Sequence, residues 1–125
     1  VRESDIISLH IPLTEETHHY VDADFIASTR RGCWLINCCR GRVVDTAALW
    51  AALEEGQLGG VGLDVFENEQ PSTWTSQEAD LYQKIYAHPN VVLSPHVAGW
   101  THESKARIAQ VLLEKVRRDF RAPMN

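Results

Sequence analysis

Short apolar segments and longer amphipathic segments alternate along this chain, and their periodicities differ. Mainly apolar runs bounded by polar residues occupy positions 5–11, 34–37, 60–65 and 91–93. Short runs of this kind, rich in β-branched residues, are typical of strands buried in a sheet. We therefore predict four strands, each followed by polar or ionisable residues.

The segments that follow the first two strands predict helices. Asp45 can cap a helix that ends at Gly56, and its apolar side chains form one stripe: Ala48, Leu49, Ala52 and Leu53. A shorter helix is expected to begin at Asp22 or Asp24 and to end at Gly32, with Arg30 and Arg31 near its carboxyl end.

The second half of the chain predicts one loop and one long helix. Residues 67–86 are mostly polar and predict a long loop with a helical turn near residues 78–85. From Thr101 onward apolar residues recur every four positions and predict a helix whose apolar face needs a partner: Ile108, Leu112, Val116 and Phe120. Strands and helices in this order are typical of an α/β fold with a parallel sheet covered on both faces.

Composition and charge restrict the classes of function. With 125 residues, 44% of them hydrophobic, the chain suffices for one domain with its own core. A formal net charge of −5 argues against nucleic acid or an anionic membrane as a partner, because both require clustered lysine and arginine. No segment reads as a signal peptide or a membrane span, so we expect a cytoplasmic protein.

The three cysteines and the histidine pair do not predict a metal site. Cys38 and Cys39 point to opposite faces of a strand, which disfavours a disulfide, and no C-x-x-C spacing occurs with Cys33. We interpret all three as reduced thiols, since a nucleophilic Cys39 would require a partnering base. His18 and His19 lack a third ligand in the pattern, so we interpret them as solvated loop residues.

One glycine-rich segment has the wrong context for nucleotide binding. The glycines at positions 59, 60 and 62 superficially resemble a dinucleotide-binding turn. That turn follows a strand and opens a helix, whereas these glycines lead into a strand, so we reject the motif.

Three ionisable residues, Arg40, Glu69 and His96, each follow a different predicted strand. Parallel strands end at one edge of their sheet, and ligands bind at that edge. An arginine can hold a carboxylate with two hydrogen bonds, and a histidine can transfer one proton while a neighbouring carboxylate fixes its tautomer. Together they suit the reversible reduction of a 2-keto acid, for which a cofactor must carry the hydride.

Each of these residues also has a purely structural interpretation. Arg40 can be a surface cation next to a helix, Glu69 a member of an acidic loop, and His96 a capped loop residue. On spacing alone both interpretations stay open.

Three ordered segments resemble the signature segments of the D-isomer-specific 2-hydroxyacid dehydrogenases, which include phosphoglycerate dehydrogenases. They are residues 36–45 (INCCRGRVVD), 62–69 (GLDVFENE) and 94–99 (SPHVAG), and residues 8–14 (SLHIPLT) resemble the strand before them. The resemblance implies the second half of a Rossmann-like doubly wound parallel sheet in residues 1–100. Residues 101–125 would then form a long crossover helix toward a substrate domain.

The resemblance also implies ligands and the roles of single residues. Arg40 is similar to the arginine that binds the substrate carboxylate, Glu69 to the acid that pairs with the histidine, and His96 to the proton donor and acceptor. The implied ligands are NAD, with NADP not excluded, and a small 2-hydroxy or 2-keto acid. The residues it places at the cofactor are His10, Ile11 and Pro12 beside the adenosine half, and Cys38, Cys39, Arg40, Asp64, His96, Ala98 and Gly99 around the remainder.

The chain departs from the family pattern at two points. Gln70 separates Glu69 from the proline that usually follows the catalytic glutamate directly, so Glu67 stays an alternative partner for His96. The glycine-rich phosphate-binding turn and most of the substrate domain are expected to precede Val1. We therefore expect the 125 residues alone to bind NAD weakly or not at all and to turn over no substrate.

Two alternatives to an enzyme are a non-catalytic, corepressor-like NAD-binding protein and a structural α/β module. The presence of all three ionisable residues favours the enzyme, with phosphoglycerate dehydrogenase-like chemistry as one member of the class. The unpaired strand edge near Asp5 and the bare stripe of the last helix predict a homo-oligomer.

Overall fold

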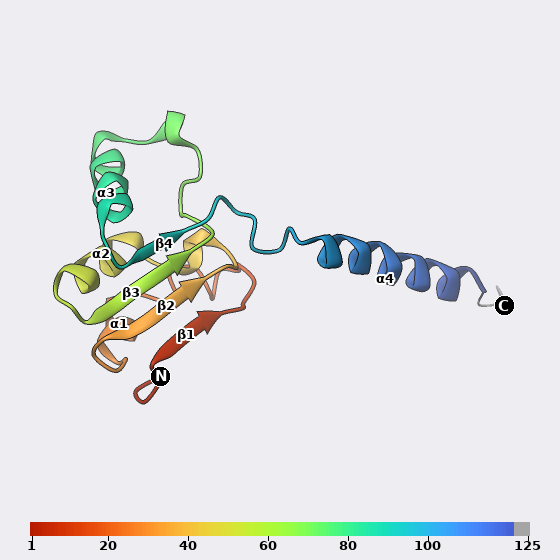
Figure 1. The fold of residues 1–125 in the computed structure, drawn as a ribbon, viewed down its shortest axis with the longest axis horizontal. Coiled ribbons are helices and arrows are strands. Elements are labelled where there is room, and N and C mark those ends of the chain that lie inside the picture. The colour runs from red at the N-terminus through yellow and green to blue at the C-terminus, as the bar shows by residue number, and fades with distance from the viewer. Residues whose placement is uncertain (122–125) are drawn as a thin grey trace.

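The computed structural model of the chain describes residues 1–121, and the side chains of residues 1–120. Strands and α-helices alternate along it (Figure 1): β1 (Ile6–Leu9), α1 (Ala23–Ala27), β2 (Cys33–Asn37), α2 (Thr46–Glu54), β3 (Leu58–Leu63), α3 (Ser76–Ala87), β4 (Val91–Leu93) and α4 (His102–Arg121). All strand pairs are parallel, in the order β1-β2-β3-β4. The predicted α/β class is confirmed, and the glycines at positions 59, 60 and 62 lie within a strand, β3, rather than in a turn that opens a helix.

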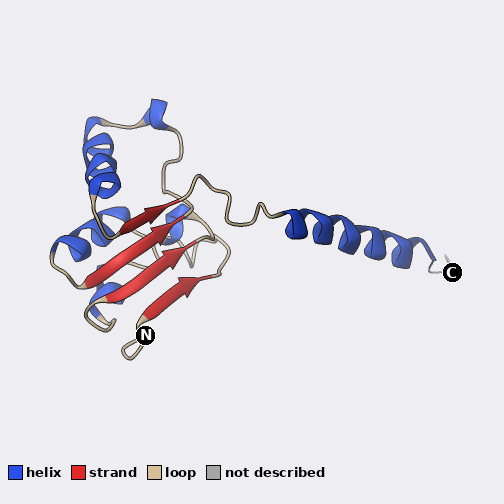
Figure 2. Ribbon diagram, in the orientation of Figure 1, coloured by secondary structure: helices blue, strands red, loops and turns tan. Residues whose placement is uncertain are grey.

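The connecting helices α1, α2 and α3 pack on one face of the sheet (Figure 2). Right-handed crossovers between strands that are consecutive in the sheet place every connecting helix on the same side. Leu35, Val61 and Ile85, all nearly fully buried, lie in the core between sheet and helices. On the other face Ile6 is 62% and Val92 64% exposed, so within residues 1–121 the helices cover one face rather than both.

Helix α1 begins as predicted and ends earlier. Asp22 caps it, because its carboxylate accepts a hydrogen bond from the Phe25 amide at 2.8 Å. The predicted end at Gly32 is wrong: α1 ends at Ala27, and Gly32, with φ of +81°, turns the chain into β2. Arg30 forms an ion pair with Asp5 at the start of the sheet.

Helix α2 is confirmed at both ends. Asp45 accepts hydrogen bonds from the amides of Ala47 and Ala48 at 2.9 and 3.0 Å, and Gly56 follows the helix with φ of +66°. Leu49 and Leu53 of the predicted stripe are buried against the sheet.

The helical turn predicted near residues 78–85 is part of a longer helix, α3, which occupies residues 76–87, so the predicted loop is too long. Thr75 and Glu78 form a capping box, in which each side chain binds the backbone amide of the other residue. This T-x-x-E signature is present in the sequence, but the many polar residues of the segment favour the prediction of a loop. Tyr82 and Ile85 are the buried residues of α3.

Helix α4 confirms the predicted last helix over residues 102–121 and extends away from the sheet (Figure 1); positions 122–125 of that prediction lie outside the described residues. Its apolar stripe is at least 49% exposed at each position: Ile108, Leu112, Val116 and Phe120. Self-association through this stripe stays a prediction. Within residues 1–121 no helix combines the length and the apolar character needed to cross a membrane.

Candidate active site

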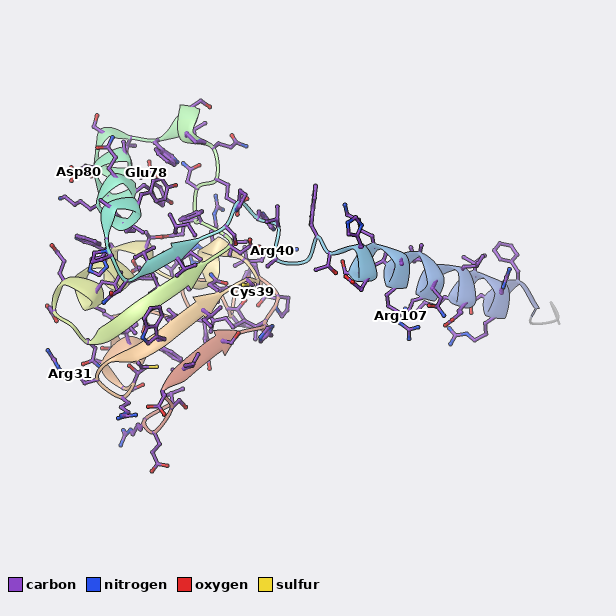
Figure 3. The ribbon with its side chains drawn as sticks, in the orientation of Figure 1. Arg31, Cys39, Arg40, Glu78, Asp80 and Arg107 are labelled. Atoms are coloured by element: carbon purple, nitrogen blue, oxygen red, sulfur yellow. The ribbon has the colours of Figure 1, made fainter. Side chains whose placement is uncertain are left out.

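The carboxyl ends of the four parallel strands form one edge of the sheet, and the predicted site residues emerge there. Figure 3 shows Cys39 and Arg40 at this edge and Arg31 at the opposite edge. A cleft of about 580 Å³ opens at the edge, and Arg40, Glu69 and His96 all line it. Residues 29 and 27 positions apart in the sequence therefore face one space.

Glu69 and His96 are in direct contact. Glu69 Oε2 lies 3.0 Å from His96 Nδ1, while its other oxygen accepts a weaker hydrogen bond from the Phe66 amide at 3.3 Å. An ionised Glu69 accepts only, so this contact requires a proton on Nδ1. The other ring nitrogen, Nε2, is then the atom that can exchange a proton with a ligand.

A buried carboxylate fixes the turn that carries His96. Asp64, 4% exposed, accepts hydrogen bonds from Ser94 Oγ at 2.5 Å, from the Val97 amide at 2.8 Å and from the Ala98 amide at 3.0 Å. Between these contacts His96 has φ of +56°, a left-handed conformation that costs a non-glycine residue about 1 kcal/mol. Asp64 therefore offsets local strain at His96.

Two opposing effects determine the ionisation of Asp64. Burial alone would raise the pKa of its carboxyl, but the hydrogen bonds from Ser94, Ala98 and Val97 outweigh that effect, and the charge of His96 acts in the same direction as they do. The net result is a pKa below the ordinary value, so Asp64 is an anion at neutral pH.

Asp64→Asn is expected to lower the free energy of unfolding at neutral pH by about 2 kcal/mol, because the two amides lose a charged acceptor. Since the folded pKa lies below the unfolded one, the stabilisation is fully present above about pH 4 and is lost as the pH falls through the folded pKa. Urea unfolding at neutral pH and in acid measures this effect. The difference between wild type and variant should shrink in acid, and a constant difference would contradict it.

The Arg40 segment is fixed by Asn37, which is 1% exposed at the end of β2. Its amide nitrogen donates to the Arg40 carbonyl at 3.0 Å, and its oxygen accepts from the Cys39 amide and from Cys39 Sγ, each at 3.1 Å. The guanidinium of Arg40 donates to the Cys39 carbonyl at 2.6 Å and is otherwise exposed at the cleft. Sequence reasoning gave Asn37 no role, since nothing in the sequence marks its partners.

The thiols at this edge act as small polar groups. Cys38 and Cys39 are free, as is the buried Cys33 at the opposite end of β2, and Cys39 donates a hydrogen bond to Asn37. Burial raises the pKa of the Cys38 thiol, and the negative charge of Asp64 raises it further. Cys38 is therefore protonated at neutral pH.

Glu67 faces other partners than His96. Its Oε1 lies 2.6 Å from His19 Nε2, and its Oε2 accepts from the Thr46 amide at 2.8 Å. Of the two glutamates considered as partners for His96, the structure thus places Glu69 in contact. The prediction of a solvated His19 is wrong, because the side chain is only 35% exposed and is bound to Glu67; a contact across 48 residues has no local sequence signal.

The cofactor residues implied by the family occupy two regions. Cys38 and Asp64 line an apolar hollow of about 320 Å³ together with Gly62 and Ser94. Gly62 lines this hollow without a side chain, and a Cβ added there would meet only Ile36, at 3.7 Å, so a flat ring has room. His10 is exposed and within 2.8 Å of Ser8 Oγ, and Ile11 and Pro12 follow it outside the cleft.

The remaining implied residues lie in the connection to α4. Ala98 and Gly99 are exposed, and the Gly99 carbonyl accepts a hydrogen bond from Ser104. Over the described part of the chain, no three histidine, cysteine or carboxylate side chains gather in a way that suits a metal ion.

Comparison with known proteins gives the same family for sequence and structure. Residues 1–98 match the family profile described as "D-isomer specific 2-hydroxyacid dehydrogenase, NAD binding domain". A glyoxylate reductase from Korarchaeum cryptofilum is 42% identical over 116 residues, which cover 93% of this chain and 32% of that protein. A D-3-phosphoglycerate dehydrogenase from Bacillus subtilis is 40% identical, covering 93% of this chain and 20% of that protein.

Among solved structures, a D-lactate dehydrogenase from Aquifex aeolicus, complexed with NAD and lactic acid, superimposes with a TM-score of 0.78 at 37% identity. The match covers 93% of this chain and 37% of that one. The chain therefore spans about a third of the length of the glyoxylate reductase and of this D-lactate dehydrogenase.

Proposed function

Because the chain belongs to the D-isomer specific 2-hydroxyacid dehydrogenase family as an NAD-binding domain, we propose that it carries the reacting side chains of an oxidoreductase acting on D-2-hydroxy and 2-keto acids. The predicted cofactor, NAD, is confirmed by the family. The single observation that supports the reaction is the meeting of Arg40, Glu69 and His96 in one cleft.

Each of the three side chains has one task in the proposed reaction. Arg40 holds the substrate carboxylate through its planar guanidinium and so orients the neighbouring carbonyl. His96 transfers a proton through Nε2 to the carbonyl oxygen during reduction and takes it back during oxidation. Glu69 holds Nδ1 and stabilises the charged ring.

The NAD site is proposed from the second, apolar hollow, which residues at the ends of β2 and β3 line. NAD, when bound, accepts or supplies the hydride. We assign the nicotinamide end to the hollow lined by Cys38 and Asp64, whose small side chains and Gly62 leave room for a ring. Cys39, Arg40, His96, Ala98 and Gly99 would complete that end, and His10, Ile11 and Pro12 would face the adenosine half.

Within this class we propose a phosphorylated substrate, 3-phosphoglycerate and its 2-keto acid. Arg42 lines the same cleft as Arg40, so the site offers one guanidinium for the carboxylate and a second for a distal phosphate. A 2-keto acid without a second anion would use Arg40 alone.

Substrate preference tests both levels of the proposal. The parent polypeptide is the natural polypeptide that contains these residues. Its oxidation of NADH is measured with glyoxylate, pyruvate, hydroxypyruvate and phosphohydroxypyruvate. We expect reduction of 2-keto acids, with the highest kcat/KM for the phosphorylated one. Arg42→Ala should raise KM for that substrate about tenfold and leave KM for glyoxylate unchanged.

Two outcomes would contradict these statements separately. If none of these 2-keto acids supports NADH oxidation, the proposed dehydrogenase activity is wrong. If Arg42→Ala affects all substrates equally, only the phosphorylated substrate is wrong.

Other parts of the interpretation stay predictions. They are the boundary near residue 100 between the nucleotide domain and the crossover helix, the weak or absent NAD binding of the 125 residues alone, the cytoplasmic location and the homo-oligomer. A corepressor-like or structural role is less well supported, because such a role gives no reason for Arg40, Glu69 and His96 to share a cleft.

A further inference from the structure

The segment after β3 carries two glutamates that face different partners, and we propose that Glu67 is a positioning residue for Glu69. Glu69 contacts His96 in the cleft, whereas Glu67 lies between His19 and the first amide of α2. This inference rests on the proposed function, because Glu69 has a catalytic task only in that reaction.

The contacts of Glu67 connect its own segment to the loop after β1 and to the start of α2. One oxygen of the carboxylate lies 2.6 Å from His19 Nε2, in the loop after β1. The other accepts from the amide of Thr46, the first residue of α2, at 2.8 Å. A carboxylate at this position also interacts favourably with the amino end of the helix. Glu67 is about three-quarters buried, so water competes little for these contacts.

The partner His19 is itself fixed by the backbone. Its amide donates to the Arg42 carbonyl at 2.8 Å, and the neighbouring Val21 exchanges two hydrogen bonds with Val43 and Asp45, each at 3.0 Å. These bonds hold the loop after β1 against the segment that follows Arg40. The side chain of His19 therefore binds Glu67 from a fixed position.

The backbone of the Glu67 segment lies directly on that of Arg40. A Cβ placed on Gly41 would meet the Phe66 carbonyl oxygen at 1.8 Å and the Glu67 nitrogen at 2.5 Å, so only glycine permits this approach. The backbones of residues 40–41 and 66–67 are therefore packed directly against each other. A shift of one segment changes the distance between Arg40 and Glu69.

Asn68, between the two glutamates, is held from the side of α3. Its amide donates to the Tyr82 hydroxyl at 3.1 Å, and its carbonyl accepts from Trp74 Nε1 at 3.0 Å. Hydrogen bonds therefore hold the segment to both α2 and α3, and Glu67 accepts the one from α2. Loss of Glu67 frees one side only, so we expect misplacement of Glu69 rather than unfolding of the segment.

The test compares Glu67→Ala, Glu67→Gln and His19→Ala in the parent polypeptide. Glu67→Ala should lower kcat about tenfold with the affinity for NADH unchanged, because a small displacement of Glu69 weakens its hold on His96. Glutamine can accept from the Thr46 amide and donate to a neutral His19, so Glu67→Gln should restore kcat to within about twofold. The double variant Glu67→Ala/His19→Ala should have about the same kcat as each single variant, because both residues act through one contact.

A second readout follows His96 without using activity. The ¹⁵N chemical shifts of the His96 ring at a fixed neutral pH report which nitrogen carries the proton. In the wild type the proton should lie on Nδ1, and Glu67→Ala should move the shifts toward those of Glu69→Gln. Glu55→Ala, the same exchange at an exposed glutamate after α2, is the matched control and should leave shifts and kcat unchanged.

The outcomes separate positioning from plain stability. If Glu67→Ala lowers the melting temperature but leaves kcat and the His96 ring shifts at wild-type values, Glu67 is merely structural and the inference is overturned. If the wild type lacks dehydrogenase activity, the proposed function fails, and the ring shifts alone then decide whether Glu67 positions Glu69.

Discussion

His96→Gln is expected to lower kcat for 2-keto acid reduction by about 10²- to 10⁴-fold, the range by which a positioned proton donor accelerates a reaction. Glutamine keeps a polar side chain of similar reach but cannot exchange a proton near neutral pH. The affinity for NADH should change little, because the contacts that hold this turn come from Asp64 to Ser94, Val97 and Ala98. Steady-state kinetics and fluorescence titration with NADH measure the two quantities.

His102→Gln is the matched control for this variant. His102 is the first residue of α4, exposed and outside the cleft, so its replacement should leave kcat and NADH affinity at wild-type values. Unchanged turnover in His96→Gln would reject the role of His96 in proton transfer.

Arg40→Met is expected to lower kcat/KM for 2-keto acids about a hundredfold, mainly through a higher KM. Removing one partner of a hydrogen-bonded charge pair costs about 3 kcal/mol, and every 1.4 kcal/mol is a factor of ten. Arg40→Lys should recover only part of the loss, because an ammonium group keeps the charge but lacks the planar fork that matches a carboxylate.

Arg31→Met supplies the corresponding control at the opposite edge of the sheet (Figure 3). Arg31 donates to the Glu55 carbonyl at 2.7 Å and is far from the cleft lining, so kinetics should not change. A KM in Arg40→Met equal to that of the wild type would show that another group holds the substrate carboxylate.

Arg40→Met and His96→Gln should change different kinetic constants, because in the proposed reaction Arg40 binds the substrate and His96 transfers a proton. Arg40 ends a segment fixed by Asn37, with its guanidinium largely exposed to the cleft. His96 sits in a left-handed turn and depends on Glu69 for its tautomer. Loss of Arg40 therefore weakens binding, whereas loss of His96 removes a chemical step.

The sequence predicted most of the helices and strands, because helix caps and apolar periodicity depend on residues close together in the chain. Asp45 and Gly56 delimit α2 through contacts within a few residues, and the apolar strand segments follow from burial alone. The wrong predictions lie where one local sequence pattern is compatible with two structures. Gly32 serves the turn into β2 instead of ending α1, and the capping box of Thr75 and Glu78 starts a helix in a stretch that is polar enough to resemble a loop.

By itself the sequence determined the alternation of strands and helices, the residue types at strand ends and the membership of a family. Only the tertiary structure decided which of two nearby glutamates faces His96, that His19 binds the other one, and that Asn37 and Asp64 fix the segments carrying Arg40 and His96. The physical reason is that capping and periodicity act over a few residues, whereas these hydrogen bonds join groups that come close only when parallel strands end at one edge of the sheet.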